Sequence, residues 1–148
     1  MTPTSRRLLL LSGPAAVAML LTGCSQHSDA ERAEISAVVE RRVSALPRLE
    51  KVRVTFLDGF DAGYALQVSA VRPATSSGQL VDAVREVLRV LVAVAEEHGL
   101  GDDLHLLVTV FDAPQSDGGT ELPPADQTDL LGVGAGFRLA TVRQHLES

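Results

Sequence analysis

Two stretches decide the fold: residues 78–98, GQLVDAVREVLRVLVAVAEEH, and residues 104–111, LHLLVTVF. In the first stretch apolar side chains recur at helical spacing, at Leu80, Val84, Val87, Leu88, Leu91 and Ala95. Ser76 and Gln79 have the spacing of a capping box, and Gly99 stands where a glycine commonly ends a helix. The second stretch is an apolar, β-branched run of strand length. We therefore expect a long, well-buried helix followed by a buried strand.

Upstream of this helix the sequence predicts a β-hairpin. Val52, Val54 and Phe56 alternate with polar residues, as in a strand that is buried on one face. Residues 58–63, DGFDAG, have the composition of a turn. Alternation resumes at residues 64–70, so we expect antiparallel strands at 51–57 and 64–70.

A further helix precedes the hairpin, and the tail after residue 111 is harder to assign. Ser28 and Glu31 form a second capping box, and apolar residues at helical spacing predict a helix at 29–46 that ends before Pro47. Residues 112–136 form a long, acidic, Gly/Pro-rich loop. The tail favours a short helix at 137–146, although Phe137, Leu139 and Thr141 also alternate as in a strand.

The predicted order is α-β-β-α-β, followed by a loop-rich C-terminal tail. A β-α-β connection within one sheet is right-handed. The simplest arrangement places the 51–57 strand between the other two strands and both helices on one face. We therefore expect residues 29–148 to form a single α+β domain, a two-layer sandwich. The element order resembles the BON domain, a module of envelope proteins that bind phospholipid or other envelope components, although residues 64–71 lack the glycine-containing motif of that family.

The first 24 residues have the features of an export signal. Arg6 and Arg7 precede an uncharged run of 14 residues, 8–21, about 21 Å as a helix and too short to span a bilayer. This pattern predicts a signal peptide. Residues 21–24, LTGC, resemble the lipobox of bacterial lipoproteins. The resemblance implies that residues 1–23 are removed, that Cys24 carries a lipid, and that residues 24–28 are a lipidated tether.

The export route has two interpretations. Residues 5–10, SRRLLL, look like a twin-arginine export motif. The alternative, which we favour, is an ordinary Sec signal that carries two arginines.

Charge and composition restrict the function further. The chain of 148 residues has a net charge of −6, with a single Tyr, four Phe and no Trp, which argues against nucleic-acid binding. Loss of residues 1–23 removes two arginines and leaves −8. Residues 29–53 carry +1 and residues 54–148 carry −9. Because anionic lipids attract basic groups, we expect the basic residues near the anchor to face the membrane; a scatter of solvated charges is the alternative. They are Arg41, Arg42, Arg48, Lys51 and Arg53.

No catalytic, cofactor or metal site is predicted. The single Cys excludes an internal disulfide and is assigned to the lipid. The histidines 27, 98, 105 and 145 form no metal-binding pattern, and the glycines 132, 134 and 136 lack the spacing of a dinucleotide-binding loop. We expect a lipid-anchored protein on the extracytoplasmic face of the cell membrane, a non-enzymatic binding or scaffolding module of the envelope. The alternatives are a small-ligand or metal-binding lipoprotein, and an envelope enzyme or enzyme accessory that uses the 112–136 loop.

Overall fold

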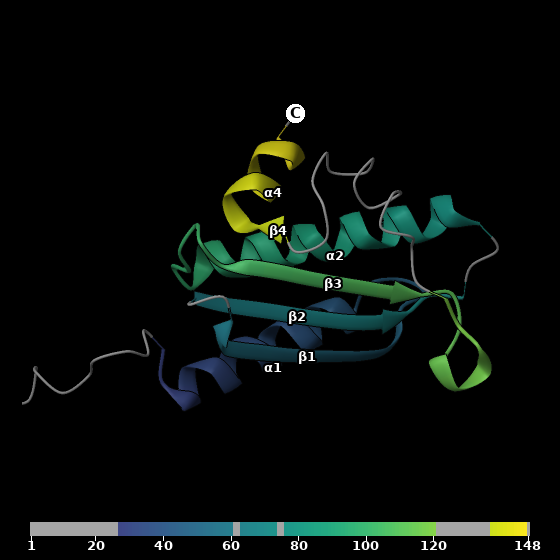
Figure 1. Cartoon of the computed structure of the whole chain (residues 1–148), viewed down its shortest axis with the longest axis horizontal. Helices are drawn as coiled ribbons and strands as arrows, with labels where there is room; N and C mark the ends of the chain where they lie inside the picture. Colours follow the sequence, from purple (N-terminus) through teal and green to yellow (C-terminus); the bar gives the residue numbers. More distant parts are fainter. Residues whose placement is uncertain (1–26, 61–62, 74–75, 121–136, 148) are drawn as a thin grey trace, which may run out of the picture.

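The computed structural model describes residues 27–60, 63–73, 76–120 and 137–147. In this part of the chain, helices pack on one face of an open, mixed four-stranded sheet (Figure 1). The predicted α+β class is confirmed. The predicted signal peptide, Cys24 and residues 121–136 of the predicted loop lie outside the described residues.

The predicted hairpin is present and longer than expected. Strand β1 (Glu50–Phe60) pairs antiparallel with β2 (Gly63–Val71), and Phe60 pairs directly with Gly63. Gly59 has φ +78°, in the left-handed region that favours glycine. The strand therefore continues through part of the predicted turn and leaves residues 61–62 as the connection.

The strand order differs from the expected one. The sheet runs β1-β2-β3-β4, with β3 (His105–Phe111) parallel to β2 and β4 (Phe137–Arg138) antiparallel to β3. The expectation that the 51–57 strand lies in the middle was wrong: β1 is an edge strand, and β2 lies between β1 and β3. β2 buries side chains on both of its faces, Leu66 and Val68 towards the helices and Ala65 on the opposite face, and such two-sided burial suits an inner position.

Both predicted long helices are present. Helix α1 (Asp29–Ser44) begins at Ser28, whose hydroxyl accepts from the Glu31 amide at 3.2 Å, while the Glu31 carboxylate accepts from the Ser28 amide at 2.7 Å. The capping box at Ser28 is thus confirmed. Helix α2 (Ser77–Glu97) begins at Ser76, but the Ser76 side chain makes no capping hydrogen bond, so the capping box predicted at Ser76 and Gln79 was wrong. Gly99, with φ +63°, lies just beyond α2, as predicted.

The core lies between the helices and the sheet. Val39 of α1 and Leu88 and Leu91 of α2 are fully buried against Leu66 of β2 and Leu106 of β3. Figure 1 shows the sheet in front of α1. This cluster buries the face of the sheet that the helices cover, and the opposite face of the sheet is not part of it.

The tail combines both interpretations of its pattern. Phe137 and Arg138 form β4, and α4 (Leu139–Leu146) follows directly, with Leu139 and Val142 buried against the core. Before it, the described part of the loop contains the short 3₁₀ helix η1 (Gln115–Asp117), the loop at the end of β3 in Figure 1. The η1 segment therefore lies beside the end of the sheet where β1 begins and β2 and β3 finish.

Candidate functional site

The sheet has a second face, opposite the helices. Register places Arg53 beside Ser69 and Thr109, and Thr55 beside Gln67 and Leu107, in rows across this face. Its side chains are more exposed than those of the helix face: Arg53, Thr55 and Gln67 are exposed, and Leu107 and Thr109 are half-buried. The buried side chains of the described helices belong to the core cluster on the other face of the sheet. We call this surface the open sheet face.

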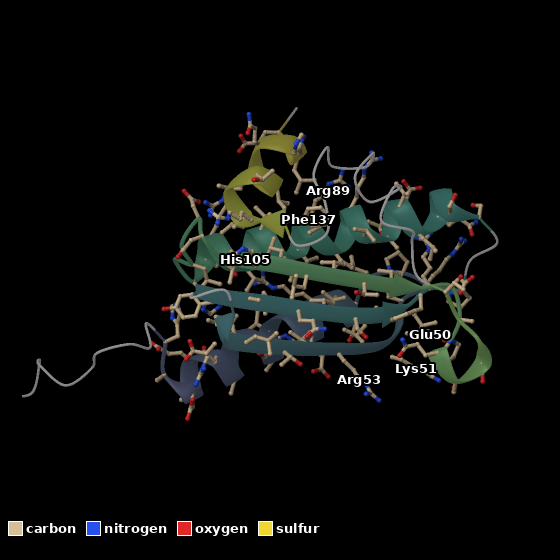
Figure 2. All side chains as sticks on the ribbon, in the orientation of Figure 1. Glu50, Lys51, Arg53, Arg89, His105 and Phe137 are labelled. Atoms are coloured by element: carbon tan, nitrogen blue, oxygen red, sulfur yellow. The ribbon has the colours of Figure 1, made fainter. Side chains whose placement is uncertain are left out.

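A cavity of about 230 Å³ lies at one end of the open sheet face. We call it the basic recess. It is formed where the start of β1 and the ends of β2 and β3 meet the η1 segment, beside Lys51 and Arg53 in Figure 2. Its polar lining is Lys51, Arg53, Ser69, Gln115 and Ser116, and its apolar lining is Val71, Phe111 and Pro114. Glu50 begins β1 next to it but is not among its lining residues.

A β-bulge at the start of β1 shapes this recess. Glu50 pairs with Val71 and Arg53 pairs with Ser69, so two residues of β1 oppose one residue of β2. Lys51, inside the bulge, has φ +51°, and Arg48 just before the strand has φ +65°. Left-handed backbone costs a non-glycine residue about 1–2 kcal/mol. Such strain concentrates at functional sites, and here it lies beside a cavity that two cations line.

The two cations of the recess differ from the four described arginines that are paired. Arg32, Arg42, Arg72 and Arg143 each form an ion pair with a carboxylate. The Arg42 guanidinium donates to the Glu97 carboxylate at 2.6 and 2.9 Å, joining α1 to α2. This contact lowers the pKa of Glu97 and raises the pKa of Arg42. Among the described carboxylates, none forms an ion pair with Lys51 or Arg53.

The structure divides the five basic residues that we expected to face the membrane. It brings only Lys51 and Arg53 together, on the open sheet face. Arg41 and Arg42 belong to α1, in the helix layer, where Arg42 pairs with Glu97 and Arg41 is exposed beside Glu40. Arg48 lies in the exposed turn between α1 and β1. Their orientation towards a membrane stays a prediction.

Three rings gather where the described chain begins, near the predicted anchor. The ring centroid of His27 lies 5.9 Å from that of Phe56 and 5.4 Å from that of Tyr64. Phe56 and Tyr64 are themselves 6.0 Å apart, within the range of favourable aromatic pairs. Residue 27 of the predicted tether is therefore packed on the domain.

The other candidate residues form no comparable site. Within the described residues, no three side chains of the His, Cys, Asp and Glu types gather as metal ligands. His105 lies on the open sheet face, in the row of Ala65, at the end of the strands opposite the recess (Figure 2). The Asp112 carboxylate accepts hydrogen bonds from the Thr120 amide and hydroxyl at 2.7 and 3.1 Å. The hydrogen bond from the amide is the main cause that lowers the pKa of Asp112. Asp112 thus closes the described part of the loop.

Sequence reasoning missed the contribution of Ser69, Gln115 and Ser116 to the recess. Ser69 is recognisable from alternation in its strand, which places it on the same side as Gln67. Gln115 and Ser116 belong to a loop whose position depends on tertiary contacts. No local pattern in the sequence indicates that they approach Lys51.

Searches against protein families, curated proteins and solved structures find no match to this chain. Among the described helices, none has the length and apolar character needed to cross a membrane. The site must therefore be interpreted from its own chemistry.

Proposed function

We propose that this chain is a lipid-anchored, extracytoplasmic binding module of the cell envelope that binds an anionic component. The observation that carries the binding role is the basic recess, where Lys51 and Arg53 have no carboxylate partner among the described residues. Lys51 and Arg53 are exposed, and an anion that reaches both side chains gains a charge-assisted contact from each. In a chain with an excess of acidic residues, two adjacent unpaired cations in a cavity favour an external anion as their partner.

The anchor is proposed from the lipobox resemblance of residues 21–24, and the packing of His27 limits the distance that such an anchor would leave between the domain and the membrane. Because His27 contacts Phe56 and Tyr64, only residues 24–26 separate the proposed lipid from the domain. Three extended residues span about 10 Å. The domain would therefore stay close to the headgroups, at a distance comparable to the Debye length of about 10 Å at 0.1 M salt.

Metabolic labelling tests the anchor. Cells that express the wild-type chain or Cys24→Ala are fed an alkyne analogue of palmitate, and the label on the purified chain is measured. We expect label on the wild type and none on the variant. Equal labelling of both chains would refute the assignment of the lipid to Cys24.

Photo-crosslinking in intact cells tests the binding role. A photoreactive residue replaces Gln115, which lines the recess, or Asp82, which is exposed on α2. We expect an envelope adduct from position 115 that disappears when Lys51→Gln and Arg53→Gln are added, and no such adduct from position 82. An adduct that persists without the two cations would contradict the proposal.

A further inference from the structure

We infer that the anion held by the basic recess is a phosphate group, an inference that rests on the proposed function and specifies its ligand. Lys51 and Arg53 supply two positive charges to one cavity. Arginine matches the geometry of phosphate with a fork of donors, and lysine binds phosphate as a point charge. The two positive charges are enough to neutralise a phosphate monoester or diester, and no carboxylate among the described residues forms an ion pair with either cation.

The neutral lining of the recess supports a tetrahedral oxyanion. Ser69 of β2 and Gln115 of η1 also line the recess, so a hydroxyl and a side-chain amide come from segments other than β1, which carries the two cations. Ser116 is engaged differently, because its hydroxyl lies 3.4 Å from the Asp117 carboxylate. A planar carboxylate needs only one fork of donors, whereas phosphate oxygens point in several directions and use donors from three segments.

The size of the recess limits what accompanies the phosphate. Its volume of about 230 Å³ is smaller than the roughly 300–1,000 Å³ of pockets that enclose a drug-sized ligand. The apolar lining consists of only Val71, Phe111 and Pro114. The recess therefore suits the phosphate and its immediate ester substituent, while the rest of the ligand extends along the open sheet face or into solvent.

Two sources of phosphate fit this chemistry, a soluble phosphate ester and a lipid headgroup. Ser69 lies five residues beyond Tyr64 on β2, about 17 Å along the strand, and Tyr64 contacts His27 near the anchor. With the strands upright on the membrane, the recess stands beyond the reach of the headgroups and takes a soluble ester. With the strands parallel to the membrane, the open sheet face meets the headgroups.

The test uses the full lipidated chain. In neutral detergent micelles, titration calorimetry measures the affinity for glycerol phosphate, with sodium acetate as the carboxylate comparison. In phosphatidylcholine nanodiscs with or without phosphatidylglycerol, a spin label at position 117, which is exposed in η1 beside the recess, reports its depth. The variant is Lys51→Gln with Arg53→Gln. The matched control is Arg85→Gln with Arg89→Gln, which removes the same charge from exposed positions of α2 that do not line the recess; Figure 2 shows Arg89 away from Lys51 and Arg53. Thermal unfolding verifies that both variants fold.

In micelles, we expect the wild type to bind glycerol phosphate more tightly than acetate. If the ligand is a headgroup, we expect instead that the spin label lies deeper in nanodiscs that contain phosphatidylglycerol. Neutralising Lys51 and Arg53 should weaken this binding by about tenfold or more, and the control should retain it. A signal in the micelle arm identifies a soluble ester, and one confined to nanodiscs identifies a headgroup. Equal binding of acetate would overturn the phosphate assignment and leave the anion-binding function standing. The absence of any anion binding, or equal losses in both variants, would overturn both.

Discussion

Replacing Lys51 by glycine should increase stability while removing a binding group. Lys51 has φ +51°, a backbone conformation that costs about 1–2 kcal/mol in any residue with a Cβ. Glycine removes this cost but adds freedom to the unfolded chain, a loss of about 0.4–1 kcal/mol. The Lys51 side chain is exposed and has no ion pair with a described carboxylate, so its loss adds little. The net expectation is a gain of about 0.5–1 kcal/mol.

Urea unfolding measures this gain, with Thr55→Gly as the matched control. Thr55 is also exposed on the open sheet face of β1, but it is not among the residues with positive φ. Its replacement should lower the free energy of unfolding by about 1 kcal/mol, since glycine weakens a regular strand. If Lys51→Gly is destabilised as much as Thr55→Gly, the strained bulge does not exist and the reasoning about the recess fails with it.

Three further predictions concern the rest of the fold. Ser28→Ala should lower the free energy of unfolding by about 1 kcal/mol, whereas Ser76→Ala should leave it nearly unchanged, because only Ser28 makes a capping hydrogen bond; equal losses in urea unfolding would contradict this. Leu88→Ala should cost about 3 kcal/mol, because Leu88 is fully buried in the core; a loss under 1 kcal/mol, below the range for buried leucines, would place Leu88 outside it. NMR titration should show the pKa of Glu97 below its ordinary value, and Arg42→Gln should return it towards that value. The stability that this ion pair contributes is present at pH values above the pKa of Glu97 in the unfolded chain. It is lost as the pH falls through the lower pKa of Glu97 in the folded chain. An unchanged titration of Glu97 in the variant would exclude the ion pair.

Local patterns in the sequence predicted the elements and their faces well. Apolar spacing at Leu80, Val84 and Leu88 identified α2, and alternation along residues 64–70 identified β2. The order of strands was not accessible in the same way, because pairing depends on the burial of both faces of β2. The inner position of β2 was visible only in hindsight, in Ala65 and Val71, small and apolar residues on the side that alternation assigns to solvent.

The candidate site was predicted only in part. Lys51 and Arg53 were among the basic residues singled out by their position in the chain. Arg42 differs from them because it has a carboxylate partner. That partner, Glu97, lies 55 residues away in sequence and meets Arg42 only through the packing of α1 on α2. The bulge was likewise hidden, since left-handed backbone at lysine leaves no compositional signal of the kind that glycine gives.

The most direct test of the basic recess is to map an anion onto it. Amide ¹H–¹⁵N spectra of the full lipidated chain in neutral micelles are recorded as glycerol phosphate is added and, in a second sample, as phosphatidylglycerol is added to the micelles. The account predicts that the shifts concentrate at Lys51, Arg53, Ser69 and Gln115 and spare the amides of α1 and α2. Shifts that concentrate on the helices, or that spread evenly over the exposed basic residues, would contradict it.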